Sequence, residues 1–238
     1  MKKLLLFITI LLLVSGCSKN SNELIMVTEA GFAPYEYYKN GEIVGVDVDI
    51  ANEIAKELGK ELVIKDIAFD SIVNEVKTGK ADFGAAGISY SEERAENVDF
   101  SNDYSVSRQV AVVRENTYKT INEIKNKKIA VQLGSIGDTY VSKNFKDADV
   151  IRQKKYLAAA EDLKASKVDA IVMDELPAKQ IIANNDGLVI INEEITSDSY
   201  GMIVKKGNKE LLDAINKVIG KLKSEGKIDE FVLNHTEE

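Results

Sequence analysis

The stretch from Gly87 to Arg94 holds the residues of this chain whose types and spacing best suit ligand chemistry. Ser91 is a good N-cap and two acidic residues follow it, so a helix is expected to begin here. A helix start presents unpaired N–H groups, and Arg94 could add a planar guanidinium that grips a carboxylate through two hydrogen bonds. The alternative is an ordinary surface helix on which Arg94 pairs with Glu93 or Glu96. The segment therefore predicts either a pocket for a small carboxylate or a plain helix start.

The rest of the chain predicts a scaffold that could position such a pocket. Helical and strand patterns alternate from residue 24 onward, which is typical of an α/β protein with largely parallel sheets. Strand–loop–helix junctions occur at 87–94 and at 132–137, and ligands bind beyond the carboxyl ends of strands in such sheets. Two edges of this kind facing each other would form a cleft between two lobes. The expected strands and helices cover residues 24–28, 47–58, 62–65, 71–78, 109–114, 128–131, 150–153, 169–173 and 211–222.

The first residues predict export and lipid attachment. Two lysines precede an apolar run from Leu4 to Val14, which is too short to span a membrane. The sequence Val14-Ser-Gly-Cys17 resembles a bacterial lipobox. Residues 1–16 are therefore expected to be a signal peptide, Cys17 to carry the lipid, and residues 17–23 to form a polar tether. The alternative is an accidental cysteine after a secretory signal.

Composition argues against several classes of function. The formal net charge is −8 and no basic cluster is present, so nucleic acid is not expected as a partner. Cys17 is the only cysteine, which rules out a disulfide within the chain. The single histidine, His235, falls in a polar C-terminal segment and is expected to be a frayed surface residue. Histidine triads, zinc sites and cofactors are therefore not expected.

Nine short motifs, taken in order, resemble the extracellular solute-binding proteins of polar amino-acid ABC transporters, family 3, which have the type II periplasmic-binding fold. The resemblance runs from about Leu24 to Leu233 and implies two lobes joined by crossover strands near 104–109 and 196–200. Lobe 1 would combine residues 24–104 and 201–238, and residues 105–200 would form the hinge strands and lobe 2. The motifs are Gly31-Phe-Ala-Pro-Tyr-Glu-Tyr37, Gly45-Val-Asp-Val-Asp49, Phe69-Asp-Ser71, Gly79-Lys-Ala-Asp82, Gly87 to Arg94, Val98-Asp-Phe-Ser101, Val131-Gln-Leu-Gly134, Val168 to Asp174, and Tyr200-Gly201.

The resemblance also implies how the backbone groups of an amino acid would be held. Arg94 would clamp the α-carboxylate, helped by N–H groups near Ser89 and at Ser135–Ile136. Relatives often carry threonine at the position of Ile136, so only the backbone N–H is expected there. The implied ligand-binding residues are Glu29, Phe32, Phe69, Gly87, Ser89, Arg94, Gln132, Ser135, Ile136 and Asp174.

The other end of the ligand has its own implied contacts. The Ser89 hydroxyl, the Gly87 carbonyl and Asp174 would receive the α-ammonium. Phe32 and Phe69 would flank the ligand side chain, and Glu29 would lie towards its tip. Each residue also has a plainer interpretation. Asp174 could only cap a helix, as could Ser135; the two phenylalanines could be core residues, and Glu29 could face solvent. Asp47 and Asp49 are expected to cap and charge a helix start, with no ligand role.

The leading expectation is a lipid-anchored, monomeric binding protein of the cell envelope. It would face the periplasm or the outside of the cytoplasmic membrane and deliver an amino acid to a membrane permease. A carboxylate at Glu29 favours a basic amino acid, with glutamine as the alternative. A second class is an enzyme resembling cyclohexadienyl or arogenate dehydratase, with Glu29 or Glu175 as a candidate general acid. A receptor sensor domain would need a membrane-spanning segment, and a lytic transglycosylase would need a second domain.

Overall fold

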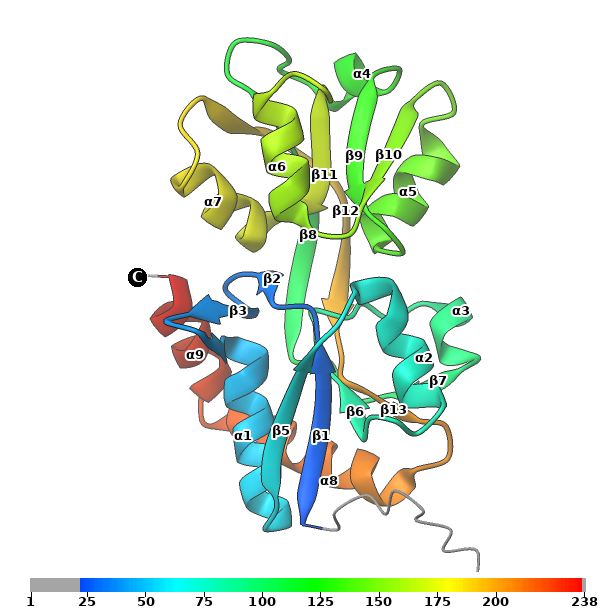
Figure 1. Ribbon diagram of the computed structural model, residues 1–238, viewed down its shortest axis with the longest axis vertical. Helices are drawn as coiled ribbons and strands as arrows, with labels where there is room; N and C mark the ends of the chain where they lie inside the picture. Colours follow the sequence, from blue (N-terminus) through cyan, green and yellow to red (C-terminus); the bar gives the residue numbers. More distant parts are fainter. Residues whose placement is uncertain (1–21, 237–238) are drawn as a thin grey trace, which may run out of the picture.

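The computed structural model describes residues 22–236 and shows two lobes stacked one above the other (Figure 1). The predicted signal peptide and Cys17 lie outside the described residues. No helix within 22–236 is both long and apolar enough to cross a membrane. The type II, two-lobed α/β architecture expected from the sequence is confirmed.

Lobe 1 is built on a five-stranded sheet with the order β5-β1-β6-β13-β7. Strand β1, which lies between β5 and β6, is an apolar run whose alternate side chains enter two cores, as the two-residue repeat of a strand requires. Leu24 and Met26 pack with the helices α1 and α8, whereas Ile25 and Val27 pack with α2. The elements are β1 (Glu23–Thr28), α1 (Val46–Leu58), β5 (Glu61–Asp66), a 3₁₀ turn η1 (Phe69–Ser71), α2 (Ile72–Lys77), β6 (Phe83–Gly84), α3 (Glu92–Ala95), β7 (Val98–Phe100), β13 (Ile203–Lys205) and α8 (Lys209–Ser224).

Lobe 2 is built on a second five-stranded sheet with the order β10-β9-β11-β8-β12. The strands β9, β10 and β11 run parallel, and helices lie on both faces of the sheet (Figure 1). Thr120 and Glu123 form a capping box at the start of α4. The elements are β8 (Ser105–Arg114), α4 (Ile121–Ile124), β9 (Lys128–Gln132), α5 (Ile136–Asn144), β10 (Asp149–Gln153), α6 (Tyr156–Lys164), β11 (Ala170–Asp174), α7 (Glu175–Ala183) and β12 (Leu188–Tyr200).

The two lobes are connected by the long strands β8 and β12, which pass between them as an antiparallel pair (Figure 1). Their register runs from Thr196 opposite Gln109 to Tyr200 opposite Ser105, and it shifts between Ile191 and Thr196. Such an irregularity bends and twists a strand locally. The hinge therefore consists of hydrogen-bonded strands rather than loose linkers.

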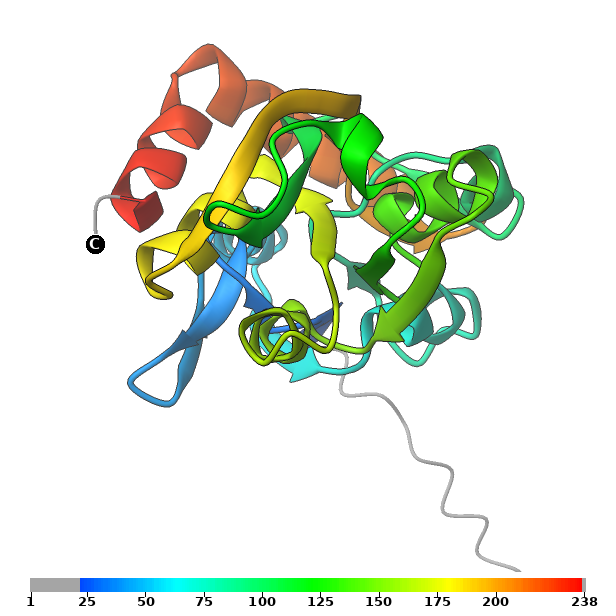
Figure 2. The same ribbon diagram turned by 90° about the horizontal axis from the view of Figure 1, so that it is seen from above.

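Two features of lobe 1 were not expected from the sequence. Residues 31–44 form a small sheet of β2 (Gly31–Phe32), β3 (Glu36–Lys39) and β4 (Glu42–Val44), and the chain ends in a further helix, α9 (Lys227–Thr236). Figure 2 shows α9 and this small sheet on the same side of the molecule. The prediction for His235 is wrong. Its ring lies 3.0 Å from the Tyr37 hydroxyl and 2.9 Å from Asp49 Oδ2, so within lobe 1 it connects α9 to β3 and α1.

The turn into α1 depends on a glycine with an unusual conformation. Gly45 has φ 135° and ψ 176°, and a Cβ there would lie 2.1 Å from the Tyr35 carbonyl oxygen. Gly59, which ends the same helix with φ 62°, has nothing within 4 Å of such a Cβ. Gly45 is therefore required both by its dihedral angles and by the close approach of the backbone.

Gly45→Ala should reduce the free energy of unfolding by at least about 3 kcal/mol, because strain and overlap with backbone act together. The matched variant Gly59→Ala carries only the left-handed strain and should cost about 1 kcal/mol. Urea unfolding of the two variants beside the wild type measures the difference. Equal losses would contradict the role given to the contact with Tyr35.

Candidate functional site

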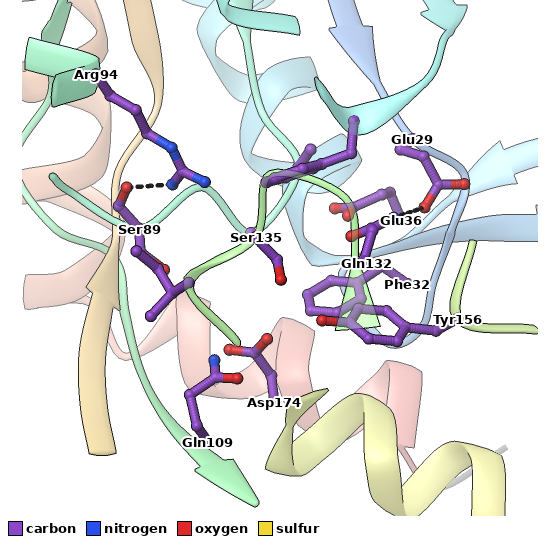
Figure 3. A pocket seen from close by; sticks show the side chains of 14 residues that line it. Glu29, Phe32, Glu36, Ser89, Arg94, Gln109, Gln132, Ser135, Tyr156 and Asp174 are labelled. Carbon is purple, nitrogen blue, oxygen red and sulfur yellow. Dashed lines mark hydrogen bonds between the residues drawn. The ribbon is translucent and has the colours of Figure 1, made fainter. Parts of the chain in front are cut away.

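A narrow pocket lies between the two lobes. The structure brings all ten predicted ligand-binding residues together around it, with four further residues that the sequence did not suggest. Arg94 and Glu29 lie at opposite ends of the pocket (Figure 3). The lining residues are Glu29, Phe32, Glu36, Phe69, Ala86, Gly87, Ser89, Arg94, Gln109, Gln132, Ser135, Ile136, Tyr156 and Asp174.

Arg94 places a positive charge at one end of the pocket. Its guanidinium donates to the Ser89 carbonyl at 2.6 Å and to the Gly134 carbonyl of lobe 2 at 2.9 Å, and it lies 5.4 Å from the centre of the Phe69 ring. No carboxylate among residues 22–236 forms an ion pair with it, so the surface pairing with Glu93 or Glu96 is not what the structure shows. Burial lowers the pKa of Arg94 from its usual value, against the opposing effect of nearby acids. The guanidinium can therefore still accept a carboxylate partner.

Backbone N–H groups accompany Arg94 at this end. Ser135 is the N-cap of α5, where its Oγ accepts from the Asp138 N–H at 3.0 Å. Its own N–H donates to the Gln132 carbonyl at 3.1 Å. Of the two donors expected at Ser135–Ile136, the Ile136 N–H at the start of the helix is thus the one left for a ligand. Arg94 itself lies in α3, which is only four residues long. Ser91 is the N-cap of this helix, and its Oγ accepts from the Arg94 N–H.

Asp174 provides a negative charge on the opposite lobe. Its Oδ1 accepts from Ser107 Oγ at 2.8 Å and from the Tyr200 hydroxyl at 2.5 Å. The side chain makes no capping bond to α7, so the capping interpretation is wrong. Burial, and then the charge of Asp198, raise the pKa of Asp174 to about 6. A nearby cation would stabilise the charged form of this buried carboxylate.

Ser89 and Gly87 lie between the two charges. Ser89 Oγ donates to Asp198 Oδ1 at 2.6 Å, which leaves the lone pairs of its oxygen free to accept from an ammonium group. Gly87 has φ 53°, and a Cβ there would lie 2.7 Å from Phe32 Cε1. Its N–H donates to Asp47 Oδ2 at 3.0 Å. This position therefore favours glycine for two reasons: its backbone is left-handed, and a side chain would overlap Phe32.

Asp47 and Asp49 lie in the first turn of α1 as expected, but the expectation that Asp47 caps the helix is wrong. It is fully buried and holds Gly87 instead of capping its own helix, whose N-cap is Gly45. Glu36 is buried beside it, and burial raises the pKa of Asp47 to about 6 and that of Glu36 well above its usual range. Burial and the charge of Asp47 both favour the neutral form of Glu36. Sequence periodicity gave no signal for this, because both acids follow ordinary turn and cap patterns.

The middle of the pocket is aromatic. Phe32 stacks against Tyr156 with ring centroids 5.8 Å apart and against Tyr35 at 6.0 Å. Phe32 is nearly buried and belongs to the core of lobe 1, so the core interpretation and the pocket interpretation hold together for this residue. Flat apolar faces of this kind suit the alkyl part of a ligand side chain.

Glu29 closes the far end. Its side chain is 1% exposed and accepts from Gln132 Nε2 at 2.9 Å, so it does not face solvent. Lys155 Nζ lies 2.9 Å from Oε1 in an ion pair, yet that oxygen accepts no aligned hydrogen bond. Burial raises the pKa of Glu29 although Lys155 and Gln132 partly offset it. Glu29 therefore meets both Gln132 and Lys155 at this end of the pocket.

Within residues 22–236, no group of three or more His, Cys, Asp or Glu side chains could hold a metal ion. Glu175, one of the two acids considered for an enzyme, does not line the pocket. It pairs with Arg108 at 2.5 Å and with Lys179 at 2.8 Å. The pocket itself is lined by a guanidinium, Arg94, and by the carboxylates of Glu29, Glu36 and Asp174.

Comparison with known proteins identifies the family of the chain. Residues 24–237 match the family model of bacterial extracellular solute-binding proteins, family 3. Residues 1–18 match a prokaryotic membrane lipoprotein lipid attachment site. The chain is similar to a probable histidine-binding protein of Campylobacter jejuni subsp. jejuni, at 32% identity over 213 residues, which are 87% of this chain and 82% of the relative.

Solved structures agree closely with this fold. A mutant of ArgBP from T. maritima superposes with a TM-score of 0.87 at 38% identity and covers 91% of this chain and 96% of that one. An ancestral arginine-binding protein bound to glutamine superposes with a TM-score of 0.86 at 35% identity, covering 92% and 100%. Because the family model spans nearly all of the described residues, the chain belongs to the bacterial extracellular solute-binding proteins of family 3.

Proposed function

We propose that this protein captures a polar L-amino acid, with a basic side chain favoured, by closing its two lobes, and delivers it to a membrane permease. The observation that carries the proposal is one pocket with a guanidinium that lacks a carboxylate partner at one end and buried acids at the other. Glutamine is the alternative ligand. The lipid site matched at residues 1–18 supports attachment of the protein to the cell envelope through Cys17.

The pocket suits a zwitterion because each charge would meet a counter-charge. Removing a carboxylate and an ammonium from water costs much free energy unless both are paired. Arg94 belongs to lobe 1 and Asp174 to lobe 2, so full pairing requires that the lobes come together. A ligand that binds both lobes thereby stabilises the closed form by its higher affinity for that form.

The far end supports a basic side chain. Glu29 and Asp66 carry two negative charges and Lys155 one positive charge, which leaves a net charge of −1 for a ligand cation to balance. A glutamine amide could donate to the Glu29 carboxylate without balancing the charge. Both ligands have counterparts among related structures, since the ancestral arginine-binding protein was solved with glutamine and with arginine.

An enzymatic role finds less support. The relatives matched in the comparisons are substrate-binding proteins. Of the acids considered for proton transfer, Glu175 lies outside the pocket and Glu29 is held by Gln132 and Lys155.

Titration calorimetry against the twenty amino acids should show binding of arginine, lysine or ornithine tighter than that of glutamine, and little binding of glutamate or leucine. Glu29 repels an acidic side chain and leaves an aliphatic one opposite a buried charge. Tight binding of glutamate or leucine without binding of any basic amino acid would overturn the proposed ligand class. Turnover of prephenate or arogenate would overturn the proposed class of protein.

Arg94→Ala should weaken ligand binding by about 2–5 kcal/mol, because the ligand carboxylate loses its charged partner in a closed site. The matched variant Arg108→Ala removes a guanidinium that pairs with Glu175 away from the pocket, and it should bind as the wild type does. Calorimetry measures both, and circular dichroism checks that both are folded. Near-normal affinity of Arg94→Ala would refute its role.

Binding should weaken by about tenfold between pH 7 and pH 5, because Asp174 is protonated below its pKa of about 6 and then no longer balances the ligand ammonium. In the ligand-free protein the sign is opposite, since the raised pKa means that the fold gains stability as the pH falls and the buried charge disappears. Asp174→Asn should bind weakly at pH 7 and lose this part of the pH dependence. An unchanged pH profile in that variant would contradict the assignment.

A further inference from the structure

Lys155 lies at the mouth of the far end of the pocket but does not line it. It is the N-cap residue of α6 in lobe 2, and its Nζ reaches across to two carboxylates of lobe 1. The distances are 2.9 Å to Glu29 Oε1 and 3.4 Å to Asp66 Oδ2. An ammonium therefore already stands where the side-chain cation of a basic ligand would have to act.

We propose that Lys155 sets the ligand selectivity of the pocket as an internal counter-cation, pairing with Glu29 when the ligand side chain is neutral and with Asp66 when the ligand carries its own cation. The inference rests on the proposed function, because it assumes an amino acid with its side chain towards Glu29. Ligand selectivity, which otherwise depends on Glu29 alone, would then also depend on a residue of lobe 2.

The two acceptors of Lys155 differ in their surroundings. Glu29 is 1% exposed and inside the pocket, whereas the Asp66 side chain is 24% exposed and outside it. Asp66 is held in place by the Ala30 N–H at 2.9 Å and by the Tyr38 hydroxyl at 3.3 Å. A second acceptor for Lys155 thus exists in a fixed position next to the first.

The backbone that carries Lys155 is tied to the same glutamate. Gln132 Nε2 donates both to Glu29 Oε2 at 2.9 Å and to the Lys154 carbonyl at 3.0 Å. The start of α6 is therefore positioned relative to Glu29 when the lobes meet. The flexible four-carbon stem of the lysine side chain can then reorient between acceptors without movement of the backbone.

Charge balance gives the direction of the selectivity. With a neutral ligand, Lys155 is the one cation among residues 22–236 that pairs with the buried Glu29, so its removal leaves that charge unpaired. With arginine bound, four charges are present, two of each sign, and the ligand itself can pair with Glu29. Removing Lys155 then takes away a like charge that competes with the ligand. Lys155 therefore favours neutral ligands over cationic ones.

The test compares arginine and glutamine binding in three variants by calorimetry. Lys155→Met should raise the ratio of the glutamine Kd to the arginine Kd by about tenfold or more, the scale of one nearby charge. Asp66→Asn should lower the same ratio, because Lys155 loses its second acceptor and the net charge of the cluster becomes zero. Lys167→Met, which removes a lysine paired with Asp162 at the surface, should leave the ratio unchanged.

A ligand-free measurement separates this inference from the proposed function. A carbon-13 NMR titration of the Glu29 carboxyl should show a higher pKa in Lys155→Met than in the wild type, because Lys155 now lowers it. An unchanged pKa, or ratios that move in the same direction in Lys155→Met and Asp66→Asn, would overturn the role of Lys155. Failure of the wild type to bind either amino acid would overturn the proposed function, and the inference with it.

Discussion

The arrangement of the pocket depends on one buried positive charge, the guanidinium of Arg94 between the two lobes, which has no carboxylate partner among residues 22–236. It is held by two carbonyl oxygens, one from each lobe, and by the face of Phe69, and none of these carries a full negative charge. The residues around it can be understood as the complement of a molecule that brings the missing carboxylate. Asp174 and Glu29, whose pKa values burial raises, line the same pocket.

Beneath the pocket, a buried polar network fixes the geometry of these groups. Asp47 holds the Gly87 N–H, Asp198 orients the Ser89 hydroxyl, and Tyr200 and Ser107 orient Asp174. Because buried polar groups are costly unless bonded, each of these partners restricts the next to a single arrangement. The binding groups are thereby organised before any ligand arrives, which reduces the entropy lost on binding.

The sequence was sufficient for the two-lobed fold and for ten of the fourteen residues lining the pocket, but not for the way their charges are compensated. Strands such as β1 and β9 are apolar runs between clear breakers, so their pattern survives without tertiary information. The strands β2 and β6 are two residues long, too short to show any period. Asp47 has the pattern of a helix cap and Lys155 that of a surface lysine, and only the folded chain shows that one binds Gly87 and the other Glu29. His235 was misjudged for the same reason, since its partners Tyr37 and Asp49 lie almost two hundred residues away.

The topology of lobe 1 has a consequence for the order of folding. Its sheet includes β13, and its core includes α8, so residues 203–224 complete a lobe that begins at residue 23. Lobe 2 forms from one continuous segment, residues 105–200, and can gain its native contacts while lobe 1 is still incomplete. Contacts between distant segments require closure of a long loop and form slowly. The last event in folding is thus expected to be the docking of β13 and α8 onto a sheet that already exists, with lobe 2 folded within the loop that this docking closes.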